Sequence, residues 1–271
     1  MSRIEDALKK VSGQKKAPQK SPSFVPGKKQ SEIKHRNPLN LLLDVVPIKI
    51  TNLLLATARE EKTNVVEEFN KLRSSVIALT KGENFLNTIL VTSTASEEGK
   101  SMTALNLAIS LAKEQDHTVL LVDTDLRRPS IHKYLDITPD VGLVHCLRDG
   151  LPIDQALVKT GVGKLVILPA GEAVKDPLDM LSSNRMKMII KELKDRYPER
   201  YVIFDTPPAH PFADAGVLAA IVDASLFVVR EGRANKDDLL KTLEEFKEHN
   251  LLGVVYNDAK MFMKKQDYYY Y

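Results

Sequence analysis

The chain has 271 residues, of which 43% are hydrophobic and 28% charged, and it carries a net charge of +3. This is the composition of an ordinary globular protein with enough length for a full core. The single cysteine, Cys146, excludes a disulfide scaffold of the secreted kind, and the six histidines lack metal-ligand spacing, which argues against a zinc site. No apolar stretch reaches the eighteen or so residues of a membrane span, so we expect a cytoplasmic protein that reaches the inner membrane, if at all, through a partner or a surface contact.

Residues 1–57 are predicted to be a basic, largely disordered arm with one short helix at 2–11. Residues 1–40 hold ten Lys/Arg and three Asp/Glu, a net +7, so the remainder sums to −4. Two interpretations stay open for this arm: a solvated tail, or a weak electrostatic contact with an anionic membrane or an acidic partner. Nucleic acid is not expected as a partner, because aromatic residues do not interleave with the basic ones.

From residue 58 the apolar residues recur at helical spacing, and apolar runs then alternate with helical stretches. Strands are predicted at 87–92, 118–123, 165–169, 201–205, 225–230 and 251–256. Helices are predicted at 100–115, 184–196, 213–222 and 235–248. Several strands are apolar on both faces, which is typical of a parallel sheet covered on both sides. We therefore predict an α/β doubly wound, mostly parallel sheet with helices on both faces, over a domain at 58–263.

Residues 94–101 lie between the first predicted strand and the first predicted long helix, where a phosphate-binding loop would lie. The P-loop pattern is Gly, four residues, then Gly-Lys-Ser/Thr, and here Thr94 takes the place of the first Gly. Gly99 lets the backbone approach phosphate, Lys100 supplies a charge for the β- and γ-phosphates, and Ser101 offers a hydroxyl to Mg²⁺. The residues expected to bind the nucleotide from this segment are Thr94, Ala95, Ser96, Glu97, Glu98, Gly99, Lys100, Ser101 and Met102. Glu97 and Glu98 oppose phosphate charge unless they point outward or contact a partner.

Two predicted strands end in aspartate. One runs into Asp123-Thr124-Asp125 and the other ends at Asp205. A carboxylate at the end of a buried strand is costly unless it meets a cation, so Mg²⁺ is its natural counter-charge. We assign the metal to Ser101, Asp123 and Asp205, and expect Asp123 or Asp125 to accept the proton of an attacking hydroxyl; the sequence does not choose between them. Arg127 is expected to neutralise phosphate charge or to bridge to a neighbouring subunit.

These three segments together resemble the motifs of the bacterial protein-tyrosine kinases (BY-kinases), P-loop NTPases of the deviant-Walker, MinD-like kind. The resemblance covers residues 58–271 and is strongest for the stand-alone cytoplasmic members that accompany polysaccharide chain-length regulators. It implies a catalytic set of Lys100, Asp123, Asp125 and Asp205, ATP and Mg²⁺ as cofactors, and contact of Asn257 with adenine. It also implies a separate membrane-embedded activator and a role in exopolysaccharide biosynthesis or export.

Members of this family assemble through a helix with the pattern Glu-x-x-Arg-x-x-Arg. The matching positions are Glu67, Asn70 and Arg73, so the middle arginine is absent and ring assembly is in doubt. The usual Gly of the loop is also replaced, by Glu97.

Residues 264–271 are predicted to be a flexible tail, since chain termini are commonly frayed. The last four residues hold half of the chain's eight tyrosines. The resemblance implies that these tyrosines are phosphorylated by a neighbouring copy: Tyr268, Tyr269, Tyr270 and Tyr271. Phosphates on adjacent residues would repel one another and the catalytic carboxylates, which predicts that the modified tail leaves the site and loosens the oligomer.

Two other functions compete with the kinase. A MinD/ParA-like ATPase switch shares the fold, but its signature lysine, five residues before the Gly-Lys lysine, is replaced by Ala95 here. A degenerate nucleotide-binding regulator without catalysis would explain the loop's carboxylates and its missing first glycine.

Overall fold

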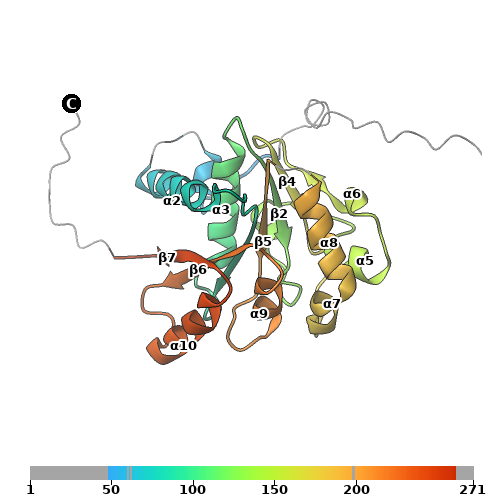
Figure 1. The fold of residues 1–271 in the computed structure, drawn as a ribbon. Coiled ribbons are helices and arrows are strands. Elements are labelled where there is room, and N and C mark those ends of the chain that lie inside the picture. The colour runs from blue at the N-terminus through green and yellow to red at the C-terminus, as the bar shows by residue number, and fades with distance from the viewer. Residues whose placement is uncertain (1–47, 60, 62, 197–198, 261–271) are drawn as a thin grey trace, which may run out of the picture. The chain divides into compact units, whose positions relative to one another are not determined.

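The computed structural model describes residues 48–59, 61, 63–196 and 199–260, and its centre is a seven-stranded sheet (Figure 1). The strand order is β3-β4-β2-β5-β1-β6-β7. All neighbouring pairs are parallel except β3 and β4, which pair antiparallel. The strands are β1 (Thr88–Ser93), β2 (Thr118–Asp123), β3 (Val158–Lys159), β4 (Leu165–Leu168), β5 (Arg200–Asp205), β6 (Ala224–Arg230) and β7 (Leu251–Asn257). The predicted mostly parallel sheet is confirmed; β3 was not predicted.

Helices cover both faces of the sheet, as predicted. They are η2 (Ala56–Ala58), α2 (Asn64–Thr80), α3 (Lys100–Ala112), α4 (Ile131–Tyr134), α5 (Leu143–Arg148), α6 (Ile153–Ala156), α7 (Leu178–Ser182), α8 (Asn184–Asp195), α9 (Asp214–Ala219) and α10 (Lys236–Lys247). Figure 1 shows α2 and α3 on one side of the strands and α7 and α8 on the other. The short helices α4 to α7 were not predicted, and α3 ends three residues before the predicted limit of 115.

Two apolar cores, one on each face, explain why the strands read as continuous apolar runs. In β1, Ile89 and Val91 pack in the core under α2 and α3, whereas Leu90 packs in the core under α5 to α10. Successive side chains of a strand point to opposite faces, so a strand that is covered twice needs apolar residues at every position.

The carboxyl ends of β1, β2 and β5 meet because these three strands are neighbours in the sheet. In the β2–β5 register Asp123 stands beside Asp205. Ligands of open α/β sheets bind outside the carboxyl ends of the strands, so the topology places all three motifs at the expected edge.

The packed domain begins earlier than predicted. Residues 48–57 were assigned to the disordered arm, but Leu55 is fully buried and the backbone N–H of Ile48 donates to the carbonyl of Thr160. The backbone N–H and the hydroxyl of Thr57 also donate hydrogen bonds to Oδ1 of Asn106 in α3. The domain therefore includes residues 48–57; the predicted helix at 2–11 and the tail at 264–271 lie outside the described residues.

Within the described part of the chain, no helix is both long and apolar enough to cross a membrane.

Candidate active site

The segment from 94 to 101 joins β1 to α3 as a loop that leaves the start of the helix open. Gly99 precedes α3 with a left-handed φ of 92°, which favours glycine, and no side chain caps the helix. Among the hydrogen bonds between described residues, none is donated by the backbone N–H groups of residues 97–100. An uncapped helix start with free N–H groups is an anion site, so the loop has the form that phosphate binding requires.

The two departures from the P-loop pattern differ in the backbone strain that they cause. Thr94, in place of the first Gly, is not among the residues with positive φ, so threonine fits there without backbone strain. Glu97, in the place of the family's usual Gly, has a φ of 66°, a region that non-glycine residues rarely adopt. Its carboxylate pairs with Arg233 at 2.6 Å, and Arg230 donates to its carbonyl at 3.3 Å. Arg230, the last residue of β6, and Arg233, three residues after it, thus hold the strained residue in place.

Lys100 faces a cluster of three aspartates. Its Nζ lies 3.1 Å from Oδ2 of Asp125, and Asp123 and Asp205 lie near enough to act on its charge. Burial lowers the pKa of Lys100, but Asp205, Asp125 and Asp123 together raise it above its ordinary value. The ammonium is therefore firmly charged, as a phosphate-binding lysine must be.

The surroundings of Asp205 and Asp123 favour the neutral form of both carboxyl groups. Burial raises the pKa of Asp205 to about 6, against the opposing effect of Lys100. Burial and the neighbouring Asp205 likewise raise the pKa of Asp123 well above its usual range, even though two backbone N–H groups, of Ser130 and Ile131, donate to its Oδ2 at 3.1 Å. Buried carboxylates of this kind gain from an added cation.

The residues present fit Mg²⁺. Both carboxylate oxygens of Asp205 and Oδ1 of Asp123 are buried without a hydrogen-bond partner among the described residues. Hard oxygen ligands are those that Mg²⁺ prefers, and it commonly completes its shell with water and substrate phosphates. The described residues contain no group of three or more His, Cys, Asp or Glu side chains that could hold a metal by themselves. Water and nucleotide phosphates would complete the ligand set of a magnesium ion held by Asp205 and Asp123.

A cavity of about 440 Å³ opens beside this cluster. It contains seven of the residues predicted to form the site: Ser96, Glu97, Gly99, Lys100, Ser101, Asp125 and Arg127. The other lining residues were not predicted: Arg128, Ser130, Tyr134, Pro207, Pro208, Pro211 and Phe212. The run Pro207-Pro208 after the aspartate was the signal that could have marked the far wall, because a strand end that continues in proline must leave the sheet.

Arg127 lines the cavity, but its guanidinium is engaged within its own chain; its contact with phosphate or with a neighbouring subunit stays a prediction. Its guanidinium makes two hydrogen bonds to the buried carboxylate of Asp214, at 2.6 and 3.1 Å, and lies 4.3 Å from the centre of the Phe212 ring. It also donates to the carbonyl of Lys175. Arg127 lines the cavity as a fixed part of its wall.

Asn257, predicted near adenine, contacts the loop itself. Its side-chain amide donates to the carbonyl of Glu98 at 2.9 Å. Of the other predicted residues, Thr94, Ala95, Glu98, Met102, Asp123 and Asp205 do not line the cavity. The predicted acceptors, Tyr268 to Tyr271, lie outside the described residues.

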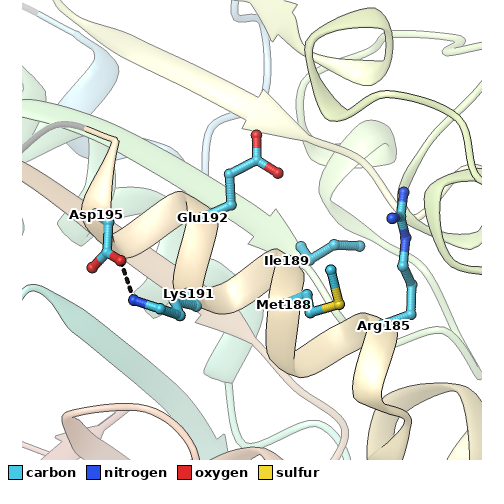
Figure 2. A pocket seen from close by; sticks show the side chains of 6 residues that line it. All are labelled: Arg185, Met188, Ile189, Lys191, Glu192 and Asp195. Atoms are coloured by element: carbon cyan, nitrogen blue, oxygen red, sulfur yellow. Dashed lines mark hydrogen bonds and ion pairs between the residues drawn. The ribbon is translucent and has the colours of Figure 1, made fainter. Parts of the chain in front are cut away.

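A second hollow, of about 320 Å³, lies on the outer surface of α8 (Figure 2). It is lined by Arg185, Met188, Ile189, Lys191, Glu192 and Asp195. Lys191 and Asp195 pair with each other there, and none of the residues predicted to form the site belongs to it. This surface offers no chemistry that competes with the cavity at the strand ends.

Comparison with known proteins agrees with this geometry. Residues 89–266 match the family described as the CobQ/CobB/MinD/ParA nucleotide binding domain. The chain is 33% identical over 214 residues to the tyrosine-protein kinase YwqD of Bacillus subtilis, covering 78% of this chain and 88% of the relative. It is 29% identical over 212 residues to the putative tyrosine-protein kinase CapB of Staphylococcus aureus, covering 78% and 91%.

A solved structure shows the same architecture. The kinase domain of the Escherichia coli tyrosine kinase ETK superposes with a TM-score of 0.70 at 25% identity, covering 80% of this chain and 84% of that one.

Proposed function

The chain belongs to the bacterial tyrosine-protein kinases within the CobQ/CobB/MinD/ParA nucleotide-binding family, and from this premise we propose that it transfers the γ-phosphate of ATP to tyrosines in the tail of a neighbouring copy. The observation that supports this most is the meeting of Lys100 with Asp123, Asp125 and Asp205 beside an open phosphate loop. Phosphoryl transfer needs positioning and neutralisation of charge more than covalent chemistry, and this cluster offers both.

Lys100 changes partner when the nucleotide binds. In the structure, its ammonium pairs with Asp125. The β- and γ-phosphates carry more negative charge than one carboxylate, so the lysine turns to them, and the free N–H groups of residues 97–100 bind the same phosphates. The exchange releases Asp125 toward the cavity.

Ser101, Asp205 and Asp123 are the residues that would hold Mg²⁺, with Asp205 the firmest candidate because both its oxygens lack partners. When bound, the ion supplies charge neutralisation across the phosphates. It also relieves the repulsion between the two buried carboxylates.

Asp125 is the better candidate for the base. It lines the cavity, whereas Asp123 is fully buried and two backbone N–H groups hold one of its oxygens. In the transfer the tyrosine oxygen forms a bond to the γ-phosphorus, the bond from that phosphorus to the ADP oxygen breaks, and the phenolic proton passes to Asp125. The pairing with Arg128 N–H at 3.0 Å fixes the carboxylate for this role.

The acceptors are Tyr268 to Tyr271. A tail that starts a few residues after β7 can leave its own domain and reach the cavity of a neighbour. Added phosphates then repel the acidic cluster and one another, so the modified tail leaves the site and loosens the oligomer.

Self-association through α2 is expected to be weak. Asn70 replaces the middle arginine and donates to Glu67 at 3.3 Å, while Arg73 pairs with Glu114 within its own chain at 3.1 Å. A separate membrane-embedded activator would compensate by gathering copies, which places the kinase in the cytoplasm at the inner membrane and in the control of exopolysaccharide export. The basic arm would add a weak contact with anionic lipid.

A MinD/ParA-like switch is the second candidate, and it is supported by the shared domain family alone. One experiment separates the two functions: the purified chain is incubated with Mg-ATP, and free phosphate and phosphotyrosine at 268–271 are measured together. A kinase yields phosphotyrosine in the tail. A switch yields free phosphate only, and that result would overturn the proposal.

A further inference from the structure

Glu98 is a carboxylate in the loop that is proposed to bind phosphate, where its negative charge would repel the ligand. It is fully buried, and it does not line the cavity. Its Oε2 accepts a hydrogen bond from the N–H of Ala95 at 2.6 Å, three residues back in the same loop, and its Oε1 lies 3.4 Å from the N–H of Arg230. The negative charge is therefore turned inward, away from the phosphate, and it closes the loop upon itself.

A buried carboxylate is stable only while its hydrogen bonds are made. Bonds from N–H groups to an ionised oxygen are about twice as strong as neutral ones. The closed loop and the inward Glu98 thus depend on each other. If the side chain is cut back, the Ala95 N–H loses a short bond, and nothing else in the loop replaces it.

Asn257 forms a second clamp on the same residue. Its amide donates to the carbonyl of Glu98. The fit is close: a Cβ on Gly99 would stand 2.1 Å from Nδ2 of Asn257. The end of β7 therefore presses against the peptide units next to the free N–H groups and restricts their direction.

We propose that Glu98 and Asn257 are positioning residues that hold the phosphate loop in its binding shape before the nucleotide arrives. This rests on the proposed function only in that the loop binds ATP. Glu98 fixes the loop by its carboxylate and Asn257 by its amide; in this role neither side chain needs to touch a phosphate. Because a loop that is already ordered loses less conformational entropy when ATP binds, the contacts made by Glu98 and Asn257 raise the affinity for ATP.

The test is ATP affinity of the full chain by calorimetry with Mg-ATP, for wild type, Glu98→Ala and Glu98→Gln. We expect Glu98→Ala to raise the Kd about tenfold. Glu98→Gln should stay within about threefold, because its amide oxygen still accepts the short bond from Ala95 N–H and only the longer contact with Arg230 N–H is lost. A Glu98→Ala protein that binds within twofold of wild type would overturn the proposal, and so would a Gln variant as weak as the Ala variant.

Asp223→Asn is the matched control, because Asp223 also accepts from a backbone N–H, that of Thr88 at 3.1 Å, but at the opposite edge of the sheet. It is expected to bind ATP as wild type does; if it lost as much affinity as Glu98→Ala, the effect would be general loosening and the proposal would fail. Should Glu98→Ala not fold, Asn257→Ala takes its place: measured with inorganic triphosphate, which has no adenine for Asn257 to contact, its Kd is expected to rise about fivefold, and an unchanged Kd counts against the clamp. Affinity is measured without regard to phosphotyrosine, so this proposal and the kinase proposal fail separately.

Discussion

Asp205 lies at the carboxyl ends of the parallel strands and Asp223 lies at their amino ends. Their surroundings shift the pKa values of the two aspartates in opposite directions. Asp205 ends β5, has no hydrogen-bond partner among the described residues, and has a pKa raised by burial to about 6. Asp223, just before β6, is also partly buried, but Lys194 and the N–H and hydroxyl of Thr88 outweigh this and lower its pKa. Asp223 shows that the fold can supply hydrogen-bond and ion-pair partners to a partly buried carboxylate. At the carboxyl ends of the strands, the raised pKa of Asp205 fits its proposed role as a ligand of Mg²⁺.

The largest effect is expected for Lys100→Met. The ammonium of Lys100 lies near the three aspartates at the carboxyl ends of the strands. We expect tail phosphotyrosine to fall by about 10³-fold or more, because the phosphates lose their fixed counter-charge. Phosphotyrosine is measured by mass spectrometry after incubation with Mg-ATP, on protein shown by circular dichroism to be folded. Autophosphorylation at the wild-type rate would reject the role of the lysine.

Asp205→Asn should separate activity from stability. We expect phosphotyrosine formation to fall about 100-fold or more, since the proposed metal ligand is lost. Without nucleotide the same variant should be more stable than wild type at pH 7, by roughly 2–3 kcal/mol, because each unit of pKa shift corresponds to about 1.4 kcal/mol. Chemical unfolding measures this, and a destabilised variant would contradict the electrostatic account.

The pH dependence of that difference has a definite sign. The pKa of Asp205 is higher in the folded chain than its ordinary value of 3.8, so its stabilising contribution is present below about pH 4 and is lost as the pH rises through about 6. The gain from Asp205→Asn should therefore be near zero at pH 4 and complete above pH 6. Unfolding series from pH 4 to 7 for both proteins check this, and a gain that is constant across the range would contradict it.

Asp223→Asn should act in the opposite direction at the other edge. It removes the charge that Lys194 and Thr88 satisfy, so we expect a loss of about 1–2 kcal/mol in unfolding free energy. Phosphotyrosine formation should stay within twofold of wild type. Asp223→Asn protein that is fully stable but inactive would show that the two edges do not differ as described.

Tyr201→Phe is the mildest change, and it tests the two ends of a single strand. Tyr201, near the start of β5, shares a hydrogen bond of 2.7 Å with the hydroxyl of Thr80. Thr80 keeps its bond to the carbonyl of Val76, so the loss should be only about 0.5–1 kcal/mol. Thermal unfolding measures it. Activity is expected to be unchanged; a large loss of activity would mean that the strand transmits strain to Asp205.

The elements that have a regular pattern of apolar residues could be predicted from the sequence. The apolar runs of the parallel strands and the long helices follow from local periodicity, and the predicted strand limits differ from the observed ones by one residue at most. It was insufficient for β3, a two-residue strand that exists only through its pairing with β4, and for the helices α4 to α7, which are too short to carry a period.

The site divides in the same way. The convergence of Lys100, Ser101 and the three aspartates at the carboxyl ends of the strands could be predicted, because residue type and strand position together indicate it. The inward turn of Glu98 and the pairing of Arg127 with Asp214 could not, because both depend on partners distant in the sequence or on a side-chain direction. Charge alone predicted a conflict with phosphate for Glu98; the structure resolves it by burial and two N–H groups.

The most direct test of the central claim is transfer between two defective copies. A tail-deleted chain (residues 1–263) with intact Lys100 is mixed with full-length Lys100→Met protein and Mg-ATP, and phosphotyrosine is mapped by mass spectrometry. Phosphate on Tyr268 to Tyr271 of the Lys100→Met copy, only when both proteins are present, is the predicted result. An unmodified tail in that mixture, with free phosphate accumulating, would contradict it.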